Sequence, residues 1–466
     1  MTIVDTLRGA LGDDLVLTGE DMAPWTRDWI GAYSWTPLCV ARPSDRDGVV
    51  AVLRAAHAAG VPVVPVGGNT GLSGGTAAEA SIMLSLDRMN KVREVRSDAR
   101  LAVVEAGVIL SNLHAAAEAE GLSFPMTFGA KGSCTIGGIL ATNAGGSNVL
   151  RYGNTRDLVL GIEVVLADGR VMDLMTELHK DNTGLNLRNL MIGCEGVLGV
   201  ITAAVVKLVP APRAYATAMV AVDTLDGALI LLNRMQEATG GQVEAFEFMP
   251  RRYIEEFASL HPEVRAPFDD AYDVNILIEL GATAPRDVQP DPDGQVPVAC
   301  YLEDVLGDML EEGSVLDAVV AQSEAQRREF WARREAAAEV STRRPAVICD
   351  VALPLDKVST FLMLADAKMA ELDAEATPVV VAHLGDGNVH YAVWLGRAEV
   401  SRDEIMEAVE EVALSLGGSF SAEHGIGLSK RSAMARFKDP VALDVMRGIK
   451  AALDPKGILN PGKVIP

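Results

Sequence analysis

The sequence lacks paired cysteines and an excess of basic residues. Its five cysteines are widely scattered and form no C-x-x-C pair, which argues against a disulfide framework and a cysteine zinc site. Lys and Arg total 41 against 64 Asp and Glu, so the formal net charge is −23. Such an acidic surface repels phosphate backbones and anionic lipid, so we expect neither nucleic acid nor a membrane surface as a partner. It also repels an anionic substrate at long range, so a substrate of this kind needs a local positive site.

Long apolar segments are missing as well. Two runs without Asp, Glu, Lys or Arg, at 55–78 and 132–150, are rich in Gly, Ser, Thr and Asn, so neither is expected to span a membrane. The N-terminal segment carries acids where a secretory signal needs a basic stretch and a long apolar one. We therefore expect a cytoplasmic protein. The oligomeric state stays open, with a homodimer as one possibility.

Two nucleotide-binding fingerprints are absent. No G-x-G-x-x-G motif follows a strand-like run, so the nicotinamide Rossmann fingerprint is missing. No G-x-x-x-x-G-K-[ST] motif occurs either, which excludes a P-loop nucleotide hydrolase.

The length of 466 residues exceeds the roughly 250–300 residues of a single core, so at least two domains are expected. The composition changes at Pro210–Arg213, the best candidate for a linker. Before it, glycine-rich turns separate predicted strands at 61–66, 81–86, 101–107, 160–169 and 199–209, with helices at 45–59 and 110–120. After it, strand-like runs at 217–223, 242–248, 274–280, 346–354, 378–384 and 389–394 alternate with helices at 224–238, 303–312, 322–340, 355–373, 402–416 and 440–452. This pattern predicts an α+β domain with an antiparallel sheet and helices on one side.

Three glycine-rich stretches in the first half point to a large bound ligand. The stretch 65–75 has five glycines within nine residues and directly follows an apolar run. Glycine lets successive N–H groups point at one anion, so such a loop can hold a diphosphate without a lysine. The alternative for a single loop is a mobile surface segment. Further stretches at 128–146 and 193–199 favour an extended ligand that needs several close backbone approaches.

Together these stretches resemble the FAD-binding domain of the vanillyl-alcohol-oxidase/PCMH flavoprotein superfamily. Within this superfamily the motifs most resemble those of D-2-hydroxyglutarate dehydrogenases. They resemble those of D-lactate dehydrogenases and glycolate oxidase flavin subunits less. The motifs that carry the resemblance are P-x-G-G-x-T-G-x-x-G-G (65–75), G-A-K-G-S-C-x-I-G-G (129–138), A-T-N-A-G-G (141–146), R-Y-G (151–153), K-D-N-T-G (180–184) and G-x-E-G-x-L-G-x-I-T (193–202).

The resemblance implies an α+β fold with two domains. A PCMH-type FAD-binding domain would occupy residues 1–212, with its core at about 36–212. An FAD-linked oxidase C-terminal domain for substrate and metal would occupy 213–466, and its helical end would return to the flavin. The implied FAD contacts are Pro65, Gly67, Gly68, Asn69, Thr70, Gly71, Gly74, Gly75, Gly129, Lys131, Gly132, Ser133, Gly137, Gly138, Asn143, Gly145, Gly146, Glu195, Gly196, Ile201 and Asn460.

The flavin is expected to be bound non-covalently. Flavin attachment in the resembled superfamily commonly uses a histidine or a cysteine. No histidine lies between His57 and His114, the window that contains the first loop. Cys134 lies in the second loop, but the resembled dehydrogenases carry this cysteine without a covalent bond.

Two short motifs hold three of the seven histidines: His383-Leu-Gly-Asp-Gly-Asn-Val-His390 and Ser421-Ala-Glu-His-Gly-Ile-Gly427. The first predicts a hairpin that can place its two histidines side by side. Two imidazoles and a carboxylate from elsewhere make a metal site with open positions for substrate. The alternative is a pair of polar residues satisfied around a turn. The adjacent Glu423 and His424 favour the metal site, because they suggest one ligand and one free base.

The resemblance assigns roles to these residues. It implies that His383, His390 and Glu423 bind one divalent metal, zinc first and manganese as the alternative. It implies that His424 is the catalytic base. The segment Phe330–Glu335 resembles the family's W-x-x-R-E motif, whose arginine contacts the substrate.

Arg334 is the residue that matches this arginine. A guanidinium fork suits a carboxylate and would counteract the repulsion between the acidic surface and an anionic substrate. The alternative is a solvated helix face, which applies well to Arg327 and Arg328.

These expectations describe an FAD-dependent D-2-hydroxyacid dehydrogenase that oxidises D-2-hydroxyglutarate, D-lactate or a similar acid by hydride transfer to flavin N5. The electron acceptor stays open between an electron-transfer flavoprotein, a quinone and a cytochrome. One alternative is a non-catalytic flavin-binding partner subunit of a glycolate-oxidase-like complex, against which the intact histidine motifs argue. Another is a zinc hydrolase with an unrelated glycine-rich domain, which predicts a colourless protein.

The sequence departs from the resembled 2-hydroxyglutarate enzymes at the substrate's far end. Ile348 stands where those enzymes have a lysine that helps hold the distal carboxylate. Ala338 replaces a threonine one turn after the substrate-binding arginine, and Ala392 replaces an asparagine. Because a carboxylate buried without partners is costly, we expect kcat/KM for D-lactate or D-2-hydroxybutyrate to at least equal that for D-2-hydroxyglutarate. The opposite preference would imply that Arg343 or Arg344 replaces the lysine.

Overall fold

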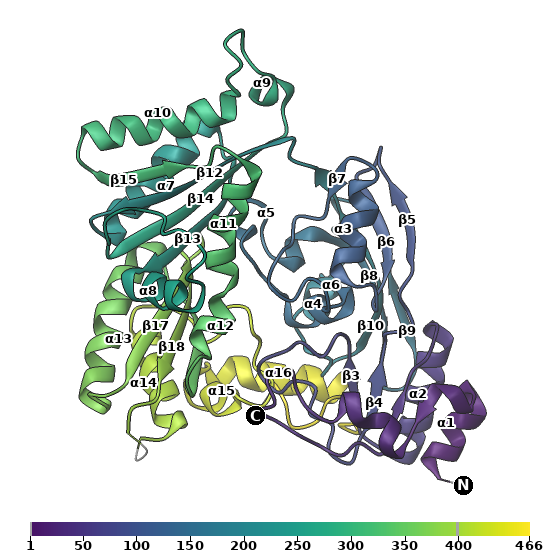
Figure 1. The fold of residues 1–466 in the computed structure, drawn as a ribbon. Coiled ribbons are helices and arrows are strands. Elements are labelled where there is room, and N and C mark those ends of the chain that lie inside the picture. The colour runs from purple at the N-terminus through teal and green to yellow at the C-terminus, as the bar shows by residue number, and fades with distance from the viewer. Residues whose placement is uncertain (1, 398–399) are drawn as a thin grey trace. The chain divides into compact units, whose positions relative to one another are not determined.

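The computed structural model describes residues 2–397 and 400–466, which cluster into two compact units (Figure 1). The first unit contains the chain up to Gly145, Gly153–Pro210 and Glu423–Pro466. The second contains Gly146–Tyr152 and Ala211–Ala422. The C-terminal segment therefore belongs to the unit that carries most of the glycine-rich stretches. None of the helices in the described ranges combines the length and apolar character needed to cross a bilayer.

The first unit contains a four-stranded sheet of order β1-β2-β4-β3 and a five-stranded antiparallel sheet of order β5-β6-β10-β8-β9. In the smaller sheet β4 lies between two parallel neighbours, while β1 is antiparallel to β2. A short pair, β11 and β7, completes the strands. Their bounds are β1 Val16–Leu17, β2 Cys39–Ala41, β3 Val63–Val66, β4 Ile82–Ser85, β5 Val92–Arg96, β6 Leu101–Glu105, β7 Leu122–Ser123, β8 Val159–Val165, β9 Val171–Leu174, β10 Val200–Lys207 and β11 Val209–Pro210.

The helices of this unit lie between and around these strands. Three of the short ones are 3-10 helices, at Asp13–Leu15, Gly19–Trp25 and Thr155–Leu158. The α-helices are α1 Ile3–Leu11, α2 Arg46–Ala59, α3 Leu110–Glu118, α4 Ile136–Thr142, α6 Leu187–Met191, α15 Arg431–Phe437 and α16 Pro440–Leu453.

Helix α2 shows how the sequence specifies an element. The Asp45 side chain accepts a hydrogen bond from the Gly48 amide at 2.8 Å and so caps the first turn. Gly60 ends the helix in the left-handed conformation, with φ of 66°. The apolar residues recur at helical spacing and are buried in the core beneath: Val49, Val52, Leu53 and Ala56.

The second unit is built on one seven-stranded antiparallel sheet of order β15-β12-β14-β13-β17-β18-β16. The strands are β12 Ala214–Val222, β13 Val243–Pro250, β14 Val274–Ala282, β15 Val315–Val320, β16 Ala346–Ala352, β17 Thr377–His383 and β18 Asn388–Trp394. The helices are α5 Val149–Tyr152, α7 Leu225–Thr239, α8 Arg251–Leu260, α9 Pro285–Val288, α10 Pro297–Glu311, α11 Glu324–Glu335, α12 Ala337–Ser341, α13 Val358–Leu372 and α14 Arg402–Ser415, and a 3-10 turn lies at Leu355–Lys357.

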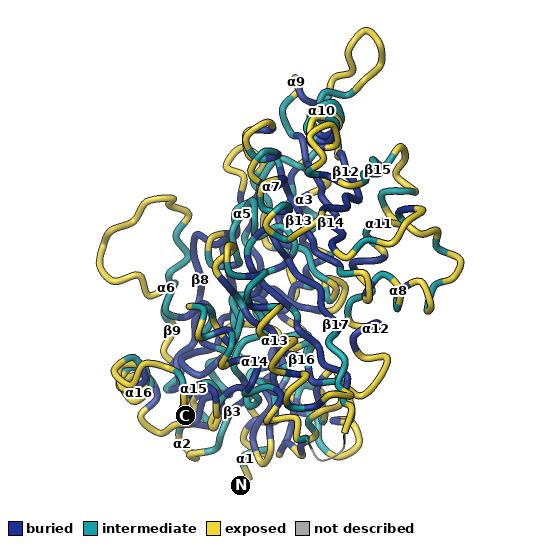
Figure 2. Tube along the Cα trace, turned by 90° about the vertical axis from the view of Figure 1, so that its left-hand side faces the viewer, coloured by how far each residue is buried: buried dark blue, intermediate teal, exposed yellow. Residues whose placement is uncertain are grey.

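Helices cover both faces of this sheet, so the expectation of helices on one side is wrong. One face packs against α7, α10, α13 and α14, and the other against α8, α11 and α12. The sequence carries the reason, because strand β14 is apolar at consecutive positions and all nine of its residues are buried. In Figure 2 the interior strands β13 and β14 are accordingly dark blue, the colour of buried residues.

Candidate active site

The first glycine-rich loop, residues 65–75, follows β3 and packs closely on the second loop. A Cβ at Gly67 would lie 2.2 Å from Thr135 Oγ1, and one at Gly68 would lie 2.1 Å from the Ser133 carbonyl oxygen. Only glycine permits this approach, so the P-x-G-G motif has a packing reason independent of any ligand. The chain then turns at Asn69, whose φ is 52°.

The second loop leads into helix α4. Thr135 is its N-cap, and Asn143 ends it in the left-handed region with φ of 51°. Gly137 packs on Ala106, 2.8 Å from where a Cβ would lie. A Cβ at Gly129 or Gly132 would meet no atom within 4 Å, so this part of the loop faces open space.

The third loop is bound to the C-terminal segment through Glu195. Its carboxylate accepts the Ile426 amide at 2.7 Å and the Gly427 amide at 2.9 Å. Burial raises the pKa of Glu195, and the two amides and the charge of Lys430 oppose that rise. The Ile-Gly pair that follows His424 is therefore fixed against a loop predicted to contact FAD.

Asn460 connects the first and third loops. Its Nδ2 donates to the carbonyl oxygens of Gly75 at 3.0 Å and Glu195 at 2.7 Å. Its Oδ1 is buried and accepts no hydrogen bond in the structure. An orphaned buried acceptor beside two glycine loops is what a ligand with N–H or O–H groups would satisfy.

These observations fit FAD. The loops offer close backbone approach, open space beside Gly129 and Gly132, and the unsatisfied acceptor of Asn460. A dinucleotide is large enough to need all three loops, and backbone N–H groups suit its diphosphate.

His424 lies next to the first of these glycine loops. Its carbonyl oxygen accepts a hydrogen bond from Ser73 Oγ at 3.0 Å, which ties it to the first loop. Its Nε2 is 3.9 Å from Glu423 Oε1, and both side chains are partly exposed. The candidate base thus belongs to the unit with the candidate flavin site.

In the second unit, the motif from His383 to His390 forms the predicted hairpin of β17 and β18. The ring centroids of His383 and His390 are 5.3 Å apart, with an interplanar angle of 78°. Among the described residues, His390 belongs to a group of possible metal ligands that includes Asp350, the residue opposite it on β16, but does not include His383. The expectation that the two histidines lie side by side is confirmed.

Arg334, near the end of α11, is buried against these strands. Its Nε donates to Glu247 Oε2 at 2.6 Å, and its Nη2 lies 3.2 Å from His383 Nε2. Glu247 Oε1 in turn lies 2.9 Å from His383 Nδ1. Burial raises the pKa of Glu247, but the charges of His383 and Arg334 outweigh burial and hold it below its ordinary value.

Asp350 is the second buried carboxylate of this region. It accepts Asn388 Nδ2 at 2.8 Å and the Ala422 amide at 3.2 Å, and its Oδ1 is 3.5 Å from His390 Nδ1. Glu423 follows Ala422 directly in the chain, so the E-H-G motif begins one residue after the amide that Asp350 accepts. Neither Asp350 nor Glu247 was predicted from the sequence as a functional residue.

The residues expected at the substrate's far end separate into two groups. Ile348 lies directly opposite Ala392 on β18, and both belong to the apolar cluster under α8, α11 and α12. Ala338, in contrast, is exposed on α12. Arg343 pairs with a glutamate of α8, and Arg344 stacks 4.7 Å above the Trp394 ring.

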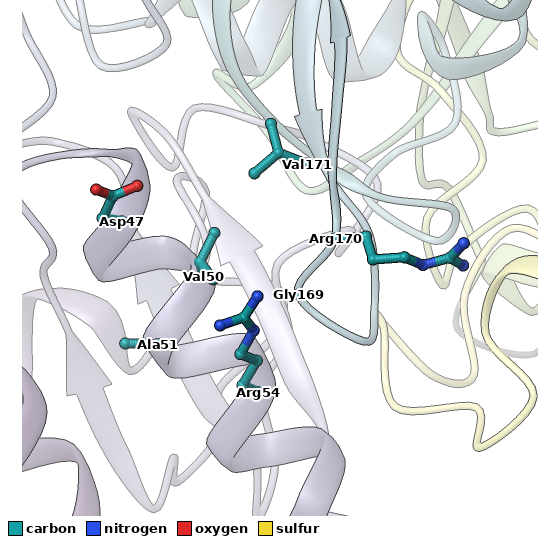
Figure 3. A pocket seen from close by; sticks show the side chains of 7 residues that line it. All are labelled: Asp47, Val50, Ala51, Arg54, Gly169, Arg170 and Val171. Atoms are coloured by element: carbon teal, nitrogen blue, oxygen red, sulfur yellow. The ribbon is translucent and has the colours of Figure 1, made fainter.

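A surface pocket of the first unit involves none of the predicted site residues. Figure 3 shows its lining on the exposed side of α2 and on the turn that enters β9. The lining residues are Asp47, Val50, Ala51, Arg54, Gly169, Arg170 and Val171.

Comparison with known proteins identifies the family. Residues 211–464 match the family described as FAD linked oxidases, C-terminal domain, and residues 37–175 match the FAD binding domain. The chain belongs to the FAD-linked oxidase family. It is therefore a flavin enzyme, and the predicted FAD-linked oxidase C-terminal domain, the fold class and the FAD cofactor are confirmed.

Relatives of this FAD-linked oxidase span nearly all of the chain. The D-2-hydroxyglutarate dehydrogenase of Xanthomonas citri pv. viticola is 36% identical over 95% of this chain and 92% of its own length. The mitochondrial D-2-hydroxyglutarate dehydrogenase of Bos taurus is 37% identical over 96% and 80%. Among solved structures, p-cresol methylhydroxylase with substrate bound superposes with a TM-score of 0.76 at 16% identity, covering 99% of this chain and 96% of that one. That likeness shows the fold alone.

Proposed function

We propose that this FAD-linked oxidase oxidises a D-2-hydroxy acid to the 2-oxo acid. The relatives named D-2-hydroxyglutarate dehydrogenase, at 36 and 37% identity, support this substrate class. The observation that carries the proposal is the pair of adjacent histidines, His383 and His390. Each lies beside a buried carboxylate, and His383 also contacts the buried Arg334. A flavoprotein without hydroxy-acid chemistry has no need of this cluster.

The glycine loops and Asn460 would hold FAD, and the bound flavin would supply the acceptor, N5, for the substrate's α-hydrogen as a hydride. Glu195 keeps the His424 segment beside the loops through the Ile426 and Gly427 amides. In this arrangement His424 removes the hydroxyl proton. Removal of the hydroxyl proton leaves negative charge on the oxygen, which favours loss of the hydride from the adjacent carbon.

His383, His390 and Glu423 would bind one divalent metal. Two imidazole nitrogens and one carboxylate suit zinc or manganese and leave coordination positions open. His390 fits such an ion, because its Nδ1 lies beside the buried carboxylate of Asp350, the usual support of a metal-bound imidazole. His383 has a similar support from Glu247, but its Nε2 lies 3.2 Å from Arg334 Nη2. The metal would hold the substrate's carboxylate and hydroxyl and acidify the latter.

Arg334 would provide the local positive charge for an anionic substrate. Its Nε is already bound to Glu247 and its Nη2 lies 3.2 Å from His383 Nε2, so Nη1 is the nitrogen that can face a carboxylate. A guanidinium held at one end in this way is pre-oriented, which lowers the entropy lost when a substrate binds.

Anaerobic addition of D-2-hydroxy acids to the purified yellow protein tests the proposal. Bleaching of the flavin absorbance by at least one acid of the D series, and not by its L enantiomer, is expected. A flavin that no member of the panel reduces would favour the non-catalytic partner subunit. Metal analysis of wild type and His390→Ala tests the metal separately: unchanged stoichiometry with full activity would remove the metal from the proposal.

A further inference from the structure

Lys463, three residues before the last residue of the chain, is a buried cation without a counter-charge. It is only 5% exposed, and its Nζ donates to the carbonyl oxygen of Pro461, two residues earlier, at 3.3 Å. No ion pair joins it to a carboxylate of the described residues. Burial lowers the pKa of Lys463 to about 8, and no neighbouring charge opposes this shift. Since an ammonium has three donors and a buried charge without partners is costly, the protein alone leaves this group unsatisfied.

Lys450, on α16 of the same unit, shows how this fold satisfies a lysine. Its Nζ pairs with Asp454 at 2.6 Å and donates to the carbonyl oxygens of Val197 and Leu459, each at 2.7 Å. Three donors therefore meet three acceptors, one of them charged. Lys463 is more deeply buried than Lys450 and yet has a single acceptor.

The chain next to Lys463 lies on the first and third glycine loops. The Val464 amide donates to the carbonyl oxygen of Gly427 at 3.1 Å, and the Gly427 amide in turn donates to Glu195 of the third loop at 2.9 Å. A Cβ at Gly427 would lie 2.1 Å from the carbonyl oxygen of Ser73 in the first loop. The unsatisfied ammonium therefore belongs to a segment that packs against the loops that fit FAD.

The backbone on both sides of Lys463 has an unusual conformation. Val464 has a φ of 62°, in the left-handed region that a β-branched side chain strongly disfavours. Asn460, which binds the carbonyl oxygens of Gly75 and Glu195, has a φ of 40°. Such conformations persist where the surrounding contacts impose them, and they cluster at ligand sites. The position of Lys463 on the loops is therefore specified at a cost in backbone energy.

We propose that Lys463 is a cofactor-binding residue whose ammonium pairs with a negative charge of FAD. The inference rests on the proposed position of FAD on the glycine loops, and it is independent of the hydroxy-acid substrate. FAD offers two such charges. The diphosphate is always charged, whereas the N1–C2=O region of the isoalloxazine becomes negative when the ring is reduced. Either one gives the ammonium the charged acceptor that the protein does not supply.

The charge of the whole chain makes a local cation more important. With a formal net charge of −23, the long-range field opposes the binding of an anionic cofactor. Backbone N–H groups of the glycine loops offset part of this repulsion, but they carry only partial charges. A full positive charge at Lys463 complements them.

Three variants separate the charge from the shape of the side chain. Lys463→Met keeps the length of the side chain and removes the charge, and a buried thioether is tolerated in a protein interior. Because the charge that it removes is uncompensated, the variant should fold. Lys463→Arg keeps the charge. Lys456→Met is the matched control, since Lys456 is exposed in the same C-terminal segment, where its Nζ donates to the carbonyl oxygen of His57 at 2.7 Å.

The first measurement is the affinity for oxidised FAD, which reports on the diphosphate. Each yellow protein is diluted in steps, and the fluorescence of released FAD gives Kd. If Lys463 faces the diphosphate, Lys463→Met should bind FAD about 10–100-fold more weakly, the effect of losing a hydrogen bond between charged groups. Lys463→Arg should lose less than Lys463→Met, and Lys456→Met should stay within about twofold of wild type, as expected for an exposed charge.

The second measurement reports on the isoalloxazine and is made with FAD at saturation. Sulfite adds to N5 of the oxidised ring and leaves a negative charge at N1–C2=O, so bleaching of the flavin absorbance gives a sulfite Kd. If Lys463 faces the ring, Lys463→Met should weaken sulfite binding about 10–100-fold, even where its FAD affinity is unchanged.

Three results would overturn the inference. They are FAD and sulfite affinities of Lys463→Met that both match wild type, equal losses in Lys456→Met, and a larger loss in Lys463→Arg than in Lys463→Met. Neither measurement uses a hydroxy acid. A flavin that no hydroxy acid reduces would therefore refute the proposed function and leave the role of Lys463 to be decided by the two affinities.

Discussion

At the scale of single residues, buried polar groups hold both candidate centres in place. In the first unit Glu195 and Asn460 join loops far apart in sequence, through backbone amides and carbonyls rather than other side chains. In the second unit Glu247 contacts two side chains, and Asp350 contacts both side chains and the Ala422 amide. This difference fits the proposed roles, since a dinucleotide is recognised by backbone and a metal by side-chain donors.

Cys134 supports the expectation that the flavin is not covalently attached. It lies in the second loop and is buried, and burial raises the pKa of its thiol to about 12. A thiol with that pKa stays protonated near neutral pH and is a poor nucleophile. Acid precipitation should therefore release the yellow colour into the supernatant. Absorbance at flavin wavelengths that stays with the pellet would contradict this.

His424→Ala should separate chemistry from binding. The side chain is not part of the Glu195 and Asn460 contacts that hold the loops, so FAD should be retained. Turnover with an artificial dye acceptor should fall at least about a hundredfold, the scale expected when a general base is lost. Flavin content and metal content measured on the same preparation serve as controls. Near-normal turnover would exclude His424 from the mechanism.

We expect substrate choice to depend on the apolar pair Ile348 and Ala392. The two residues lie opposite each other in an apolar cluster, so a second substrate carboxylate placed against them would lose hydration without gaining hydrogen bonds from either side chain. We expect kcat/KM for D-lactate or D-2-hydroxybutyrate to at least equal that for D-2-hydroxyglutarate in a dye-coupled assay.

A clear preference for D-2-hydroxyglutarate would contradict this and would call for another cation. Arg344, which stacks on Trp394, is the better candidate for this cation, because Arg343 is already paired with Glu256. Arg344→Ala should then reduce kcat/KM for D-2-hydroxyglutarate and leave D-lactate unaffected.

At the scale of secondary-structure elements, most of the fold could be predicted from periodicity and turns. The predicted strand at 274–280 is β14, and the helix predicted at 440–452 is α16. Helix α8 and strand β15 were missed, and the helix predicted at 322–340 divides at Ala336 into α11 and α12. Helix α8 is rich in charges, and its own aromatic residues Tyr253 and Phe257 become buried only when the distant strands form the sheet. Propensity within one window does not contain that information.

The same limit applies to the site. Both histidine motifs are visible in the sequence because their residues are close along the chain. Glu247 is 136 residues from His383, and Asp350 is 40 residues from His390. Only the pairing of β13 with β17 and of β16 with β18 brings these carboxylates opposite the histidines. The roles of the individual site residues, including the FAD contacts, remain predictions.

Loop packing gives a prediction at this scale. Gly68→Ala would place a methyl group 2.1 Å from the Ser133 carbonyl oxygen, so the first and second loops must separate. We expect a loss of about 1–3 kcal/mol in the free energy of unfolding, typical of overpacking, together with weaker FAD retention. Gly448→Ala is the matched control, because a Cβ there meets nothing within 4 Å in helix α16 and should be neutral or stabilising. Thermal unfolding and the flavin-to-protein absorbance ratio measure both effects, and equal behaviour of the two variants would refute the packing argument.

At the scale of the whole molecule, the compact units do not follow the chain order. The segment Gly146–Tyr152 clusters with the second unit, where Arg151 and Tyr152 both bind Glu244 at 2.8 Å. The segment Glu423–Pro466 clusters with the first unit. The boundary predicted near residue 212 reflects a change in composition and stays a prediction. Composition along the chain cannot reveal segments that return to an earlier unit.

The net charge of −23 gives the last prediction, because it acts on every anionic substrate before any contact forms. Repulsion between like charges is screened over about 10 Å at 0.1 M salt and over longer distances at lower salt. Raising the ionic strength from about 0.01 to 0.3 M should therefore increase kcat/KM by roughly two- to tenfold, provided the long-range field outweighs the local attraction of Arg334. The increase should be larger for the dianion D-2-hydroxyglutarate than for the monoanion D-lactate, since the repulsion scales with substrate charge. Steady-state kinetics with both acids over a sodium chloride series measure the two slopes. A decrease of kcat/KM with salt would show that the local positive site governs substrate capture, and Arg334→Gln should then abolish that decrease.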